Sequence, residues 1–233
     1  CWEKVDYSQI EYRFLAHYAV GRGSDLLRSR YNDDPNIDYH DNTYREVCPL
    51  LQWNPDDEEN AKARRRPIKN INFGLTYGMG KPKLKRSLML YFQGQSSNDE
   101  IEARFKAYHQ ANPYVKDTMD ATSREPNLLG YITTILGRRS RFELWQPLYG
   151  SEDRNLALPY HLAVQQWGNG IKRAFLHKAI NRRLQGSAAD LMKVAMWKCW
   201  KAGVYNVIGY PRLTVHDESD HSVVDSSPQS NEA

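Results

Sequence analysis

The stretch VDYSQIEYR, residues 5–13, places an aspartate where an apolar strand gives way to a helix. The strand is predicted to end at Asp6, and helical spacing of apolar residues follows over 8–20. A second segment, LTVHDE at 213–218, carries Asp217 at a tight turn between two strand-like runs. A lone aspartate at a strand end is most often a turn or helix cap, so the two segments carry weight only as a pair.

Paired carboxylates at strand ends are typical of a metal site. Strands hold such groups rigidly, and their hard oxygen atoms suit Mg²⁺. Two of them can hold two ions about 4 Å apart, one activating an attacking hydroxyl and the other steadying a leaving group. Asp6 and Asp217 therefore predict a site for two Mg²⁺ ions, with Mn²⁺ as a substitute.

A third segment, RRPIKNINFGLTYG at 65–78, repeats a cation or an aromatic residue every fourth position. On a helix this spacing forms one slowly winding stripe, made of Arg65, Lys69, Phe73 and Tyr77. Two cations near a helix amino terminus suit a triphosphate, and the aromatic rings suit a sugar and a base. The alternative is a solvated basic helix start followed by two core aromatics.

Length, charge and cysteine content limit the class of protein. The chain has 233 residues, a formal net charge of +4 and three separated cysteines without metal-ligand spacing. This favours one large or two small domains, reduced thiols and a cytoplasmic location. No apolar run approaches the roughly 18 residues of a membrane span, so no membrane partner is expected.

The remaining elements are predicted from caps, breakers and periodicity. Asn54-Pro55 starts a helix, Pro67 begins a second helix, and Ser97 with Glu100 forms a capping box. Further expected elements are a helix at 40–51, one starting at Pro113, a hairpin over Gly130–Arg141, an amphipathic helix at 187–202, and strands at Val204–Gly209 and Arg212–His216. Residues 142–170 have no clear period.

In order, residue type and spacing, the three segments resemble the polymerase motifs of family A DNA polymerases. The resemblance covers essentially the whole chain. It implies an α+β right-hand polymerase core, with an antiparallel-sheet palm built from both ends of the chain and helical fingers between them. The expected divisions are palm at 1–30, fingers at 31–172 with the motif B helix at about 66–78, and palm again at 173–233. The thumb, the exonuclease and the C-terminal end are expected to lie outside the chain.

The resemblance also implies roles for single residues. Asp6, Asp217 and the carbonyl of Tyr7 match metal ligands, and Lys69 matches the proton donor to pyrophosphate. Glu218 completes the HDE triplet with a weaker role. The nucleotide-binding set is Gln9, Glu11, His40, Arg65, Lys69, Phe73 and Tyr77. Within it, Glu11 matches the residue that closes off the 2′ side of the sugar.

The segment HKAINRRLQGSAAD at 177–190 matches a fourth family region, which touches primer–template DNA. The expected DNA-binding residues are Arg138, Arg139, His177, Asn181, Gln185 and His216. Several have ordinary alternatives: a solvated charge run for the arginines, a surface pair for Asn181 and Gln185, a strand histidine for His216 and a helix-cap histidine for His40. His177 and the long 142–170 segment lean towards phage members.

The resemblance implies template-directed DNA synthesis, with dNTPs added to a primer 3′-hydroxyl by two-metal nucleotidyl transfer in replication or repair. Two departures stand out: Pro67-Ile68 replaces small residues, and HDESDHS at 216–222 is polar where apolar residues usually follow. The second departure predicts weaker pairing of the last strand. A single-subunit RNA polymerase and a non-catalytic DNA-binding fragment are the alternatives; Glu11 argues against the first, and the intact aspartates against the second.

Overall fold

The computed structural model describes residues 2–76, 81–91, 97–149 and 156–223. Described segments from the first and last parts of the chain form one antiparallel sheet with the order β1-β8-β7, made of Trp2–Asp6, Glu218–Ser222 and Pro211–Val215. The polar strand β8 is therefore the central strand and pairs on both sides. The prediction of weak pairing was wrong, because Ser219, Asp220 and His221 are buried and find partners within the sheet.

Helices follow the first strand; the sequence predicts those over 8–20 and 40–51, whereas the helix at Ser24–Asp33 was not predicted. They are α1 (Ile10–Tyr18), α2 (Ser24–Asp33) and α3 (Tyr39–Val47), followed by the short turn η1 (Pro49–Leu51). Asp38 caps α3, since its side chain accepts from the backbone N–H groups of His40 and Asp41. The apolar face of α1 is buried, which ties it to the core.

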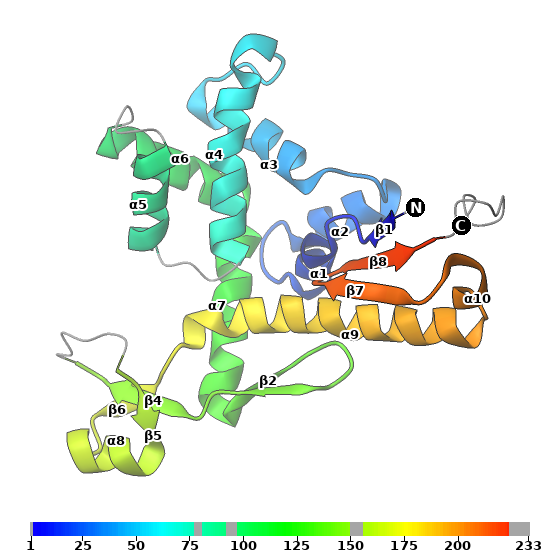
Figure 1. Cartoon of the computed structure of the whole chain (residues 1–233). Helices are drawn as coiled ribbons and strands as arrows, with labels where there is room; N and C mark the ends of the chain where they lie inside the picture. Colours follow the sequence, from blue (N-terminus) through cyan, green and yellow to red (C-terminus); the bar gives the residue numbers. More distant parts are fainter. Residues whose placement is uncertain (1, 77–80, 92–96, 150–155, 224–233) are drawn as a thin grey trace.

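The helical middle of the chain begins with α4 (Glu58–Thr76), which is upright in Figure 1 and lies above the horizontal, long helix α9 (Ala179–Lys201). Sequence reasoning split this region at Pro67, but α4 runs through Pro67 as one helix. The proline removes one backbone donor, and burial of Pro67, Ile68 and Ile71 against the core compensates. Beside α4 lie α5 (Lys81–Tyr91) and α6 (Asn98–Ala111), the latter opened by the predicted capping box of Ser97 and Glu100.

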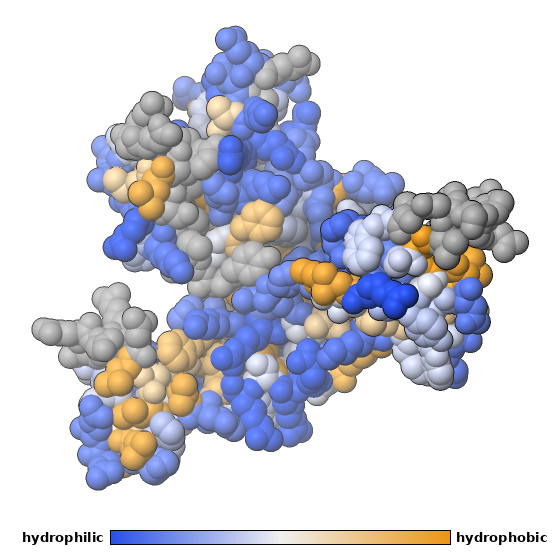
Figure 2. Space-filling view, viewed as in Figure 1, coloured by the Kyte–Doolittle hydropathy of each residue, from blue (hydrophilic) through white to orange (hydrophobic). Residues whose placement is uncertain are grey.

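After α7 (Pro113–Leu129) comes the predicted hairpin, β2 (Tyr131–Thr133) paired with β3 (Arg139–Arg141). The segment without clear period forms a lobe with the strand order β5-β4-β6. Its elements are β4 (Leu144–Pro147), β5 (Leu158–Pro159), α8 (Tyr160–Trp167) and β6 (Ile171–Arg173), followed by η2 (Leu176–Lys178). Figure 2 shows hydrophobic side chains gathered on this lobe and a largely hydrophilic surface over α4.

The strand predicted at Val204–Gly209 was wrong, because α10 (Tyr205–Ile208) occupies this place. The backbone N–H groups of Val204, Asn206, Val207 and Ile208 donate to preceding carbonyls and close this short turn after α9, so these donors are not available to a strand ladder. Among the helices described, none combines the length and the apolar composition that crossing a bilayer requires.

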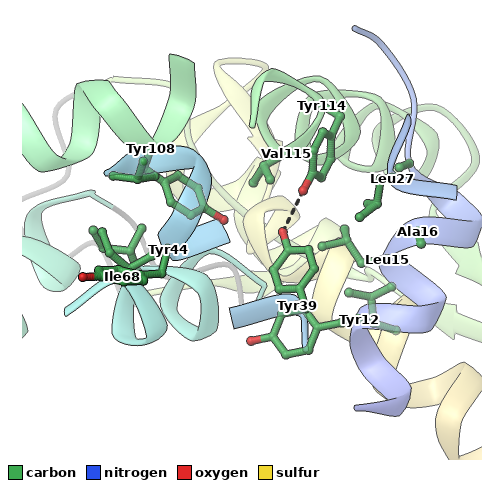
Figure 3. Close-up of a cluster of buried hydrophobic side chains, with 14 of the residues drawn as sticks. Tyr12, Leu15, Ala16, Leu27, Tyr39, Tyr44, Ile68, Tyr108, Tyr114 and Val115 are labelled. Atoms are coloured by element: carbon green, nitrogen blue, oxygen red, sulfur yellow. Dashed lines mark hydrogen bonds between the residues drawn. The ribbon is translucent and has the colours of Figure 1, made fainter. Parts of the chain in front are cut away.

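The core joins the first helices to the helical middle (Figure 3). Tyr39 of α3 stacks on Tyr12 of α1 with ring centroids 4.4 Å apart, and its hydroxyl lies 3.0 Å from that of Tyr114 on α7. Buried tyrosines need such partners for their hydroxyl groups. This cluster fixes α1, and with it the end of β1, relative to α3 and α7.

Candidate active site

The structure brings Asp6 and Asp217 together at one edge of the β1-β8-β7 sheet. The backbone N–H of Tyr7 donates to the carbonyl of Asp217 at 3.4 Å, and Asp6 lies directly opposite Glu218 in the β1–β8 ladder. Burial, followed by the negative charges of Asp217 and Glu218, raises the pKa of Asp6. A carboxyl group whose pKa is raised by neighbouring negative charges favours a bound cation.

Two residues beside this edge adopt the left-handed backbone conformation that side chains usually avoid. Gln9, which precedes α1, has φ 53°, and His216, in the β7–β8 turn, has φ 57°. Such strain concentrates at functional sites. It allows the chain to turn sharply after Asp6 and just before Asp217.

Glu11, in the first turn of α1, faces the same edge. Burial raises the pKa of its carboxyl, and the charges of Asp217 and Asp6 contribute in the same direction, whereas His216 opposes them. Gln9 is engaged elsewhere: its Oε1 accepts from the backbone N–H of Tyr39 at 2.9 Å. That bond links the start of α1 to the start of α3.

The predicted stripe lies along α4, and its two cations, Arg65 and Lys69, have different partners. Arg65 donates to Asp38 Oδ2 at 2.8 Å and lies 3.5 Å from Asp41 Oδ1. Lys69 Nζ lies 5.6 Å from the centroid of the Phe73 ring. Tyr77, the last member of the stripe, lies outside the described residues.

His40 packs directly against this stripe. Its Nδ1 accepts from Nδ2 of Asn72 at 3.1 Å, and its ring lies 4.9 Å from that of Phe73. Burial lowers its pKa to about 4; Lys69 and Arg65 act in the same direction and Asp38 opposes them. The imidazole is therefore neutral at pH 7 and tied to α4, which differs from the simple helix-cap alternative.

The two predicted DNA-binding arginines of the hairpin have different partners. Arg138 donates to Asp190 Oδ1 and to the carbonyl of Gly186 on α9, both at 2.9 Å. Arg139 is exposed, and its guanidinium lies 4.5 Å from the centroid of the Tyr131 ring. Arg138 therefore anchors the hairpin to α9, and Arg139 is the better placed of the two to meet a phosphate.

The fourth predicted segment forms η2 and the first turns of α9. His177 is exposed beside Phe175, while Asn181 and Gln185 are half-buried on α9. Although the residue is largely exposed, partial burial of its ring and the nearby Lys178 lower the pKa of His177. Oδ1 of Asn181 is buried and has no hydrogen-bond partner among the described residues.

Sequence reasoning missed two residues near the aspartates, Lys4 and Asp220. Lys4 Nζ donates to Glu218 Oε1 at 2.7 Å and lies 3.8 Å from Asp220 Oδ1. The only available signal was the polar strand after Asp217, and its meaning depends on a register that one sequence does not reveal. Within the described residues, no group of three metal-ligating side chains forms a closed metal site.

The model of "DNA polymerase family A" matches residues 1–229. This chain belongs to that family. The α+β polymerase core predicted from the sequence is confirmed.

Two curated relatives illustrate the range of the family. A "DNA-directed DNA polymerase" of Pseudomonas phage M6 is 28% identical over 96% of this chain and 33% of its own length. The "DNA polymerase I" of Helicobacter pylori strain 26695 is 31% identical over 94% of this chain and 20% of its own length. The chain thus spans a third or less of these relatives.

A solved structure shares the fold. The POL domain of Pol1 from M. smegmatis, in complex with DNA primer-template and dNTP, matches 97% of this chain and 34% of its own chain. The TM-score is 0.64 at 25% sequence identity.

Proposed function

We propose that this chain is the catalytic palm and fingers of a DNA-directed DNA polymerase, which adds dNTPs to a primer 3′-hydroxyl and releases pyrophosphate. The observation that carries the proposal is the meeting of Asp6, Asp217 and Glu11 at one sheet edge, although Asp217 lies more than two hundred positions away in the sequence. The relatives named polymerases support it. The proposed setting is replication or repair.

The donor set at this edge fits Mg²⁺. Asp6, Asp217 and the carbonyl of Tyr7 offer hard oxygen ligands, and Mg²⁺ is usually held by one or two carboxylates together with substrate phosphates and water. The absence of a third ligating side chain among the described residues is therefore compatible with such a site. When bound, two ions would lower the pKa of the primer hydroxyl and stabilise the charge on the leaving pyrophosphate.

The stripe on α4 supplies the nucleotide-binding groups. Arg65 and Lys69 are one helical turn apart, so both can contact one triphosphate. Arg65 would exchange its bonds to Asp38 and Asp41 for phosphate oxygens, and Lys69 would give a proton to the pyrophosphate. The neutral His40, bonded to Asn72, would hold this part of α4 in place and offer its remaining ring nitrogen to a phosphate.

Glu11 supports deoxyribose selection. Its side chain is half-buried beside the aspartates, so a ribose 2′-hydroxyl would meet a carboxylate in a confined place. This observation favours a DNA product over the RNA product of a single-subunit RNA polymerase. The DNA partner is proposed to be a primer–template, contacted through Arg139, His177, Asn181, Gln185 and His216.

Primer extension tests the proposal. The full chain, with Mg²⁺ and a short primer–template, is offered dNTPs or rNTPs separately. Extension with dNTPs is expected, and Glu11→Ala is expected to raise the use of rNTPs relative to dNTPs by about 100-fold. Efficient extension with rNTPs by the wild-type chain would favour the RNA polymerase alternative, and DNA binding without any extension would favour a non-catalytic module.

A further inference from the structure

Lys4 reaches across the β1–β8 ladder towards the candidate metal-binding edge. Its ammonium group donates to Glu218 Oε1 at 2.7 Å and lies 3.8 Å from Asp220 Oδ1. In the ladder, Lys4 lies opposite Asp220, and Asp6 lies opposite Glu218. Because opposite partners and residues two positions apart share a face, all four side chains lie on the same face of the sheet.

Negative charge predominates on this face. Asp6, Glu218 and Asp220 lie on it, and Asp217 lies in the adjoining turn. Among the described residues, Lys4 is the only cation that forms an ion pair with Glu218 or Asp220. Charges at this spacing interact strongly enough to decide which carboxylate is available to a metal ion.

Asp220 explains why the lysine is held here. Its side chain is only 5% exposed, and its Oδ1 has no hydrogen-bond partner among the described residues. A buried carboxylate without a compensating cation is costly. Asp220 therefore favours a Lys4 position close to β8, and from that position the ammonium group also contacts Glu218.

We infer that Lys4 is a positioning residue for the metal site. It keeps the Glu218 carboxylate on the sheet, out of the ligand set formed by Asp6 and Asp217. This inference rests on the proposed function, since it concerns the same edge. Without Lys4, the Glu218 carboxylate is free to turn towards Asp6 and to act as an additional ligand.

Mn²⁺ binding to the full chain, without DNA or nucleotide, tests this inference. Free Mn²⁺ is measured by electron paramagnetic resonance. Lys4→Met is expected to lower the Mn²⁺ dissociation constant about fivefold, and Lys4→Arg is expected to retain the wild-type value. In Lys4→Met/Glu218→Gln the gain is expected to vanish, because Lys4 acts through Glu218.

Arg212→Met is the matched control, since it removes an exposed cation from β7 of the same sheet. If Arg212→Met and Lys4→Met lowered the Mn²⁺ dissociation constant equally, the loss of any positive charge would explain the effect and the inference would be overturned. A gain in Mn²⁺ affinity that persists in Lys4→Met/Glu218→Gln would overturn it as well. If Lys4→Met does not fold, Glu218→Gln alone decides. A loss of Mn²⁺ affinity as large as that of Asp217→Asn would make Glu218 a ligand and overturn the inference, whereas a change of less than about twofold supports it.

Primer extension by the wild-type chain is read separately. If the wild-type chain extends the primer but the variants do not show the expected changes in Mn²⁺ affinity, only the positioning role of Lys4 is overturned. The Mn²⁺ pattern without extension would support that role and count against the proposed polymerase activity.

Discussion

The backbone N–H of Tyr7 donates to the carbonyl of Asp217 across 3.4 Å. This bond closes the sheet edge where the first and last motifs of the chain meet. Asp6, directly before Tyr7, is thereby held beside Asp217, and both carboxylates are fixed by backbone rather than by flexible side-chain contacts.

Lys69→Met is expected to lower the rate of nucleotide addition about 100-fold, because a general acid would be lost from the leaving pyrophosphate. DNA affinity should stay near the wild-type value. Single-turnover extension at saturating dNTP checks the rate. Lys62→Met, an exposed lysine near the start of the same helix, is the control; equal losses in the two variants would count against the role of Lys69.

His40 makes the stability of the chain depend on pH. Its folded-state pKa is about 4, below the 6.5 of an unperturbed histidine, so the unfolded chain binds a proton more readily between these pH values. The free energy of unfolding should fall as the pH decreases from 7 to 5, with a contribution of about 2 kcal/mol from this group. Urea unfolding of wild type and His40→Gln at both pH values checks this.

The difference between the two proteins isolates the histidine, because other titrating groups are common to both. It should shrink at pH 5. A difference that is the same at both pH values would show that His40 is not buried in its neutral form.

Gly186→Ala is expected to destabilise the chain by about 2 kcal/mol. A Cβ at this position would lie 2.6 Å from Cγ2 of Thr134, whose hydroxyl donates to Asp190 and so cannot turn away freely. Thermal unfolding checks the prediction. Gly170→Ala, where the nearest atom lies at 3.8 Å, is the control and should be nearly neutral.

Arg138 and Arg139 should separate stability from DNA binding. Arg138→Met leaves the buried Asp190 without its ion pair and should cost about 2 kcal/mol of unfolding free energy. Arg139→Met should leave stability unchanged and reduce the salt dependence of DNA binding by about one phosphate contact. Unfolding curves and binding titrations over a range of salt concentrations distinguish the two; the reverse assignment would contradict the hairpin geometry.

The sequence predicted the parts of this fold that depend on local chemistry. The turn at Asp217, the capping box of Ser97 and the hairpin after Gly130 each follow from residues close together in the chain. The errors arose where packing overrides local preference. Pro67 lies inside a helix because its surroundings bury it. The polar strand β8 pairs on both sides, and its buried polar side chains have partners, Asp220 with Lys4 and Ser219 with His221.

In the candidate site, too, features set by local sequence could be predicted, and contacts between distant residues could not. Asp6 and Asp217 could be paired from their motifs, and the electrostatic coupling of both to Glu11 agrees with that pairing. The anchoring of Arg138 by Asp190, and the contact between Lys4 and Glu218, join residues separated by 52 and 214 positions. Only the register of the folded chain reveals such contacts.

Primer extension by Asp217→Asn tests the central claim most directly. The change keeps the size of the side chain and removes its charge, so the sheet edge should keep its shape while losing its affinity for divalent ions. With Mg²⁺ and dNTPs, the wild-type chain should extend the primer, and Asp217→Asn should bind the same DNA without extending it. Full extension by Asp217→Asn would contradict the account.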